Sequence, residues 1–277
     1  MSLRNRALAL SATLASLSTL APVTAHGQST VATNTLMASS YVFRGVTLTN
    51  VPTAQPKLAI SAPSAGGTVS AWVAGNVEFA IPSGANTLSE GGGVAGVNEI
   101  DLVAQYAHKA GPALLSVGAT RYEYSGHNRV LTTSYNTTEI FLGSRLDNVW
   151  GTPSITANWD VQTIHGVYVE AAAAHSVPLG RFAPVVGIVA GYTAGQEARG
   201  ATDQYYSFTQ KGLTHVDISA STTIAVAAMA IAPAVHLQLS PSGQNTRAVG
   251  ALARNADRGA KLWFGFDLGW AHAFDKR

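Results

Sequence analysis

The last stretch of the sequence constrains the fold most, because its side chains alternate in size and polarity. Every second residue from Leu262 to Phe274 is large and mostly apolar, and the residues between them are small or polar apart from Trp263. A period of two places the two sets on opposite faces of a β-strand, whereas a helix would scatter both around its circumference. The segment is therefore predicted to be a two-sided strand.

The same alternation recurs along the chain and predicts an all-β fold. It is clear at 99–106, 155–160 and 215–220, where apolar and polar residues take turns. Segments of this kind, bounded by turn residues, are typical of strands. We expect about twelve strands, at 32–43, 54–62, 68–80, 97–108, 113–124, 136–146, 153–162, 166–176, 183–194, 212–222, 229–240 and 261–274.

Long and short connections mostly alternate between these strands. The long ones lie at 81–96, 125–135, 195–211 and 241–260, and tight turns lie at 63–67 and 109–112. An up-and-down transmembrane barrel has short periplasmic turns and long extracellular loops. A secreted β-sandwich, the competing interpretation, would bury the apolar set in one core and gives no reason for this rhythm. The predicted fold class is a transmembrane up-and-down antiparallel β-barrel of about 12 strands.

The N-terminal residues are typical of a secretory signal. Arg4 and Arg6 precede an uncharged run at 7–21, and Val23 and Ala25 place small residues before a cleavage point. We expect residues 1–25 to be a cleaved signal peptide and residues 26–277 to form an outer-membrane barrel domain in a Gram-negative cell.

Composition agrees with a membrane or globular chain and excludes other classes. Charged residues make up 12% of the sequence and apolar residues 47%, which excludes an intrinsically disordered chain. There is no cysteine, so no disulfide scaffold or thiolate metal site is available. The formal net charge of +2 gives no reason to expect a nucleic-acid partner.

If the apolar set faces lipid, the other set faces the lumen. The predicted pore-lining residues are Arg44, Glu78, Glu99, Asp101, Gln105, Glu139, Arg145, Asp160, Glu170, Asp217 and Asp267. A lumen rich in carboxylates would favour cations or neutral polar solutes over anions. Alternatively, acids and bases pair across the interior and close it. Small inward residues such as Gly143, Gly187 and Gly265 favour some open space.

Arg44 has two interpretations. It is either a cation at the constriction of the lumen or a structural arginine at a strand end that bridges to a loop carboxylate. We favour the structural role, because Gly45 beside it marks a turn or a close backbone approach.

The sequence does not indicate an enzyme. His175 and Ser176 are adjacent and point to opposite faces of a strand, and no G-x-S-x-G motif is present. The histidines lack the spacing of metal ligands, so neither a metal nor a cofactor is expected. The glycines at 91–93 do not open a helix and do not indicate a phosphate site.

Aromatic residues are predicted to mark the membrane interfaces or the lipid face rather than a ligand site. These are Trp72, Tyr106, Trp159, Trp263 and Trp270. The aromatic loop residues at 205–208 are candidates for an inward constriction, although such loop tips are as often exposed.

The segment 39–49, which contains Tyr41, Phe43, Arg44 and Gly45, resembles the N-terminal hallmark of the TorF-type porins, a family of proteobacterial outer-membrane proteins. Residues 138–143 and the closing strand are similar as well. The resemblance implies an outer-membrane barrel with a pore role, no known substrate and no catalytic residues. The chain departs from the usual barrel ending, because Asp275, Lys276 and Arg277 follow Phe274.

The expected function is passive diffusion of small polar or cationic solutes through the outer membrane. The expected partners are outer-membrane lipid, those solutes, and the barrel-insertion machinery that reads the C-terminal strand. A closed barrel with a structural or loop-mediated binding role is the alternative, and a barrel hydrolase is a weaker one.

Overall fold

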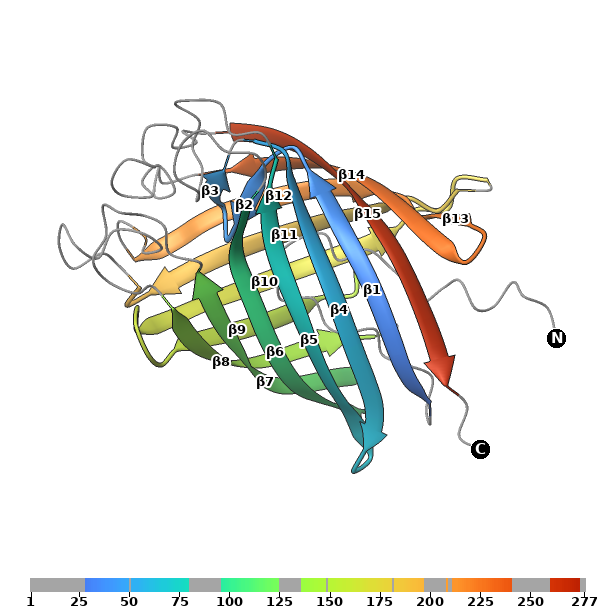
Figure 1. Cartoon of the computed structure of the whole chain (residues 1–277), viewed down its shortest axis with the longest axis horizontal. Helices are drawn as coiled ribbons and strands as arrows, with labels where there is room; N and C mark the ends of the chain where they lie inside the picture. The colour runs from blue at the N-terminus through green and yellow to red at the C-terminus, as the bar shows by residue number, and fades with distance from the viewer. Residues whose placement is uncertain are drawn as a thin grey trace.

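A computed structural model shows a closed antiparallel β-barrel (Figure 1). It describes residues 28–49, 51–79, 96–124, 136–147, 149–180, 182–196, 208, 211–240 and 260–274. The expected signal peptide and the three residues after Phe274 lie outside these ranges. No helix in the described ranges is long and apolar enough to span a membrane.

Twelve strands form the wall, and each pairs antiparallel with its neighbours. They are β1 (Ser29–Ala38), β4 (Thr53–Ser64), β5 (Gly67–Glu78), β6 (Gly96–Ala110), β7 (Ala113–Tyr124), β8 (Thr137–Leu146), β9 (Ser154–Asp160), β10 (Gly166–Ser176), β11 (Val185–Ala194), β12 (Gly212–Ser221), β14 (Met229–Leu239) and β15 (Ala260–Phe274). The barrel closes where β1 pairs with both β4 and β15. The predicted fold class and strand number are confirmed.

Three short strands lie outside the wall order. β13 (Ile224–Val226) pairs with β14 beyond the end of β12. β2 (Tyr41–Phe43) and β3 (Val46–Thr49) form a separate two-stranded sheet. The prediction of one strand over 32–43 was therefore wrong at its end, because the chain bends at Ser39 and Ser40 and re-enters as this hairpin.

The up-and-down order places the connections at two ends. The terminal end carries Ser29, Phe274 and the turns after β4, β6, β8, β10 and β12. The loop end carries the β2–β3 hairpin and the connections after β5, β7, β9, β11 and β14. Apart from the short link after β9, these connections are long in sequence, as expected.

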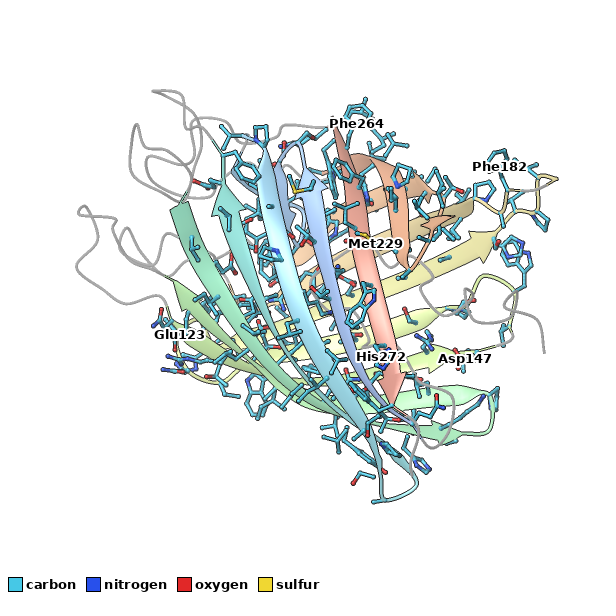
Figure 2. The ribbon with its side chains drawn as sticks, turned by 45° about the vertical axis from the view of Figure 1, so that its right-hand side comes forward. Glu123, Asp147, Phe182, Met229, Phe264 and His272 are labelled. Carbon is cyan, nitrogen blue, oxygen red and sulfur yellow. The ribbon has the colours of Figure 1, made fainter. Side chains whose placement is uncertain are left out.

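The outer face is apolar, which decides between the barrel and the sandwich. On β15, Leu262, Phe264 and Phe266 are exposed, and Phe264 keeps 53% of its surface accessible (Figure 2). The alternate residues Trp263 and Gly265 are buried on the inside. A sandwich would have buried the first set instead. The large apolar side chains therefore face outward, as the alternation predicts.

Aromatic and histidine rings gather around the terminal end. Trp270 stacks on His272 with ring centres 6.0 Å apart, and His272 contacts Phe274 at 4.8 Å. Trp150, which is 81% exposed, packs against His175 with ring centres 4.9 Å apart. Amphipathic rings of this kind form the girdles of membrane barrels at the lipid–water boundary.

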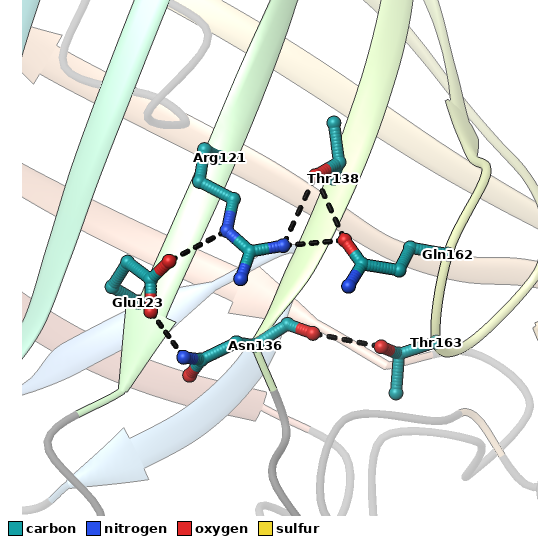
Figure 3. Close-up of polar contacts among 6 residues, drawn as sticks. All are labelled: Arg121, Glu123, Asn136, Thr138, Gln162 and Thr163. Carbon is teal, nitrogen blue, oxygen red and sulfur yellow. Dashed lines mark hydrogen bonds and ion pairs between the residues drawn. The ribbon is translucent and has the colours of Figure 1, made fainter.

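A polar network covers the outer face at the loop end of β7, β8 and β9 (Figure 3). Arg121 donates to Glu123 at 2.6 Å, to Thr138 at 3.2 Å and to Gln162. Asn136 donates to Glu123, and its carbonyl accepts from Thr163 at 2.7 Å. The apolar band therefore ends at this network on one side and at the ring-rich terminal end on the other.

Candidate lumen site

The hairpin formed by β2 and β3 has a turn of two residues, Arg44 and Gly45. Phe43 pairs with Val46 across it. Arg44 has φ of 50° and Gly45 has φ of 82°. Positive φ at both central residues defines the type I′ turn, which suits the twist of a hairpin and favours glycine at the second position. Arg44 and Gly45, which belong to the segment 39–49 that resembles the porin hallmark, thus form the tip of a hairpin.

This hairpin crosses the lumen. It follows β1, yet Arg44 at its tip contacts Glu139 on β8, which stands five strands from β1 in one direction and seven in the other. On the other side of the barrel, the side-chain amide of Gln238 on β14 donates a hydrogen bond to the Gly45 carbonyl at 2.5 Å. Lys261 of β15 donates to the Thr47 hydroxyl at 2.8 Å. The hairpin therefore connects opposite sides of the barrel near its loop end.

Arg44 and Glu139 form a bidentate ion pair. The two guanidinium nitrogens donate to the two carboxylate oxygens at 2.7 and 2.6 Å. Both side chains are shielded from solvent, with 9% and 3% of their surface accessible. Fork-like pairs of this geometry are among the strongest charge-assisted hydrogen bonds.

Three aromatic side chains complete the surroundings of Arg44. The guanidinium carbon lies 4.3 Å from the centre of the Tyr168 ring and 4.8 Å from that of Phe43. The Tyr122 hydroxyl donates to Glu139 at 3.1 Å. Tyr168 in turn stacks on Phe208, with ring centres 6.1 Å apart. We call Glu139, Tyr122 and Tyr168 the arginine cage.

Arg44 pairs with a carboxylate, as its structural interpretation expected, but the expected location of that partner was wrong. The carboxylate is on the opposite wall and not in a loop, because the hairpin turns inward and does not extend the strand. Sequence reasoning also missed Tyr122 and Tyr168. Tyr168 shares the inward phase of Glu170 on β10, so the alternation could have placed it in the lumen.

Apart from Arg44, which lies at the tip of the β2–β3 hairpin, the predicted pore-lining residues lie on the inner side of the wall. Eight are buried carboxylates or amides, namely Glu78, Glu99, Asp101, Gln105, Glu139, Asp160, Glu170 and Asp217. Asp267 is partly exposed and accepts from Asn34 at 3.0 Å. Arg145, also partly exposed, pairs with Asp147 at 2.8 Å near the terminal end. Within the predicted set, Arg44 and Glu139 are brought together by two direct hydrogen bonds.

Asp160 has a local structural role. One carboxylate oxygen accepts the backbone N–H groups of Gln162, Thr163, Ile164 and His165, each at 3.1 Å. The other accepts from the Thr137 hydroxyl at 2.7 Å. A carboxylate that gathers four amides fixes the short link between β9 and β10.

The small inward residues do not leave simple open space. A Cβ on Gly118 would lie 2.4 Å from the Phe141 ring, and one on Gly143 would lie 2.5 Å from the Ser116 hydroxyl. At Gly191, the Tyr168 hydroxyl would lie 2.3 Å away. These glycines give room to neighbouring side chains, which corrects the expectation that they widen the lumen.

Two tryptophans expected at the interface face inward. Trp72 is buried in a small apolar cluster with Ala59, Val103 and Phe141, where Lys57 lies 4.7 Å above its ring. Trp263 is buried and stacks on His236 at 3.8 Å. Trp159 and Trp270 face outward as predicted. The two errors arise because inward aromatics also fill a barrel of this size.

The Asp217–His236 pair is the arrangement closest to a catalytic dyad in the described ranges. His236 Nδ1 lies 2.8 Å from the Asp217 carboxylate, and its Nε2 is buried without a hydrogen-bond partner there. A serine hydrolase would hold a hydroxyl against that nitrogen. The described residues also contain no group of three or more side chains suited to a metal ion.

The wall, outer surface and lumen together define the fold class of the outer-membrane β-barrels. The chain belongs to the Gcw_chp family, described as bacterial proteins of unknown function, whose model matches residues 23–232. No curated protein matches the sequence.

Solved structures share the fold at low sequence identity. LpxR from Salmonella typhimurium is 9% identical with a TM-score of 0.50, covering 87% of this chain and 99% of its own. An outer membrane channel from Pseudomonas putida F1 is 12% identical with a TM-score of 0.50, covering 91% of this chain and 97% of its own. Both likenesses concern the fold alone.

Proposed function

We propose that the chain forms a pore in the outer membrane for small polar or cationic solutes. In this proposal, residues 1–25 are removed before the chain reaches that membrane. It would sit in outer-membrane lipid after insertion through its C-terminal strand. The finer resemblance to TorF-type porins belongs to the same proposal.

The composition of the lumen carries this proposal. Among the described residues, the lumen holds the carboxylates Glu78, Glu99, Asp101, Glu139, Asp160, Glu170, Asp217 and Asp267 and the cations Arg44, Lys57, Arg145 and Lys261. Charged rings of one sign select ions of the opposite sign in channels. Passage would follow the concentration gradient, and no residue would perform chemistry.

The β2–β3 hairpin gives the second part of the proposal, which concerns the narrowest point of the pore. A twelve-stranded barrel lies between the filled eight-stranded barrels and the aqueous sixteen-stranded ones. A hairpin across such a lumen narrows it near the loop end. We therefore propose that β2 and β3 form the constriction through which solutes pass.

Current through a planar bilayer in asymmetric salt tests the pore. We expect a reversal potential that indicates cation preference, and a smaller one when Glu99→Gln and Asp101→Asn are combined. The Glu123→Gln variant is the control, since Glu123 lies in the outer polar network. A trace that stays sealed at all voltages would overturn the proposal.

A closed barrel with a structural role is the second candidate. The ion pair across the lumen and the apolar cluster around Trp72 favour it, because both fill the interior. The sealed trace in the experiment above is the result that this candidate predicts.

A further inference from the structure

The arginine cage comes from the barrel wall, whereas its occupant comes from the hairpin. Glu139 lies on β8, Tyr122 on β7 and Tyr168 on β10. Arg44 is the only contribution of the hairpin to the ion pair. The wall therefore presents a complete set of groups for one cation, and the chain supplies that cation from a separate element.

The cage is held in place without Arg44. The Tyr122 hydroxyl hydrogen-bonds one Glu139 oxygen, and stacking on Phe208 supports the Tyr168 ring. The Tyr168 hydroxyl also reaches Glu170 at 3.4 Å. If Arg44 left, Glu139 would be a buried carboxylate without its cation, which is costly. A vacated cage therefore favours the entry of another cation.

The geometry distinguishes a guanidinium from an ammonium group. Two N–H donors face the two oxygens of Glu139, while the guanidinium carbon lies over the Tyr168 ring, 4.3 Å from its centre. An ammonium is a compact charge that lacks both the planar face and the fixed fork. Stacking of a planar cation on an aromatic ring adds further attraction.

The hairpin is not part of the backbone ladder of the wall, although the side chains of Gln238 and Lys261 bind it. β2 and β3 pair with each other and not with any barrel strand among the described residues. Ala38 and Thr53, which flank the segment, pair with each other directly. Withdrawal of the hairpin tip would therefore break no hydrogen bond of the wall ladder.

We propose that the arginine cage is a binding site for solutes that carry a guanidinium group, with Arg44 as its built-in competitor. This names the solute class of the proposed pore and rests on that function only for the passage of such solutes. Binding itself requires no current.

The Arg44→Asn variant empties the cage and keeps the turn. Asn-Gly is the dipeptide that type I′ turns prefer, so the hairpin retains its shape. We expect methylguanidinium to raise the thermal unfolding midpoint of this variant in detergent. It should bind about tenfold more tightly than methylammonium, the difference expected for one good bidentate contact.

Three further variants keep the test decisive. Adding Glu139→Gln to Arg44→Asn should abolish the preference, and Arg121→Asn, which removes an outward arginine, should create none. If Arg44→Asn does not fold, Arg44→Lys keeps the charge without the fork, and methylguanidinium should still stabilise it more than methylammonium. Equal effects of the two cations, or a preference that survives Glu139→Gln, would overturn the site.

Currents of the same variants separate the two proposals. A current with no discrimination between the two cations would contradict the site and leave the pore. If methylguanidinium and methylammonium shift the unfolding midpoint differently but no variant carries current, the pore is contradicted and the binding site stands.

Discussion

Arg44 and Glu139 are joined by two hydrogen bonds of 2.7 and 2.6 Å, although they are 95 residues apart in sequence and the hairpin that carries Arg44 starts on the other side of the barrel. The pair converts a local hairpin into a brace across the lumen. On the other side of the barrel, Gln238 and Lys261 bind the hairpin through the Gly45 carbonyl and the Thr47 hydroxyl.

Glu139→Gln is expected to destabilise the barrel by about 3–5 kcal/mol, because it leaves a buried guanidinium without its counter-charge. Urea unfolding in lipid vesicles measures the loss. In a double-mutant cycle, Arg44→Asn should recover part of it. Strictly additive effects of the two substitutions would show that the pair is not coupled.

Asp160→Ala is expected to cost about 1–3 kcal/mol, because four backbone amides lose one shared acceptor. The matched control is Asp147→Ala, which removes a partly exposed pair with Arg145 and should cost no more than about 1 kcal/mol. The same unfolding assay compares them. A larger effect at Asp147 than at Asp160 would contradict the role given to this link.

Gly118→Ala should destabilise the barrel by about 1–3 kcal/mol through overpacking. The added methyl group would meet the Phe141 ring and the Ala104 carbonyl, each at 2.4 Å. At Gly75, the nearest atom would be 3.4 Å away, so Gly75→Ala is the tolerated control. Folding yield into vesicles and unfolding midpoints report both, and equal behaviour would count against the packing described.

Leu142→Arg tests whether the outer face lies in lipid. Leu142 is 63% exposed near the middle of β8, where water would tolerate an arginine but a bilayer would not. The expected cost in vesicles is about 2–4 kcal/mol. Val149→Arg, in the turn after β8, should change stability by only about 0.5 kcal/mol. A neutral effect at Leu142 would place that face in water.

The barrel could be predicted from sequence because the residues of each strand alternate between an apolar outer face and a more polar inner face. Large and small residues such as Phe264 and Gly265 alternate only if one side of the strand meets an apolar surrounding and the other does not. The alternation also placed Glu99 and Asp101 on the inner side, since a period of two fixes the phase of every strand.

The hairpin could not be predicted in the same way. Tyr41 and Phe43 continue the alternation of the preceding strand, and Ser39–Ser40 is a weak signal for a bend. The partner of Arg44 depends on barrel closure, which brings β8 opposite β1 and which no local pattern encodes. Trp72 and Trp263 were misplaced because size and polarity alone do not tell an interface ring from an interior filler.

Replacement of the hairpin tests the central claim most directly. Ala38 and Thr53 are paired, so a short Gly-Ser linker can join them in place of residues 39–52. Single-channel recording should show a larger conductance for this variant than for the full chain, with cation preference in both. An unchanged conductance, or sealed traces from both proteins, would contradict a pore that the hairpin constricts.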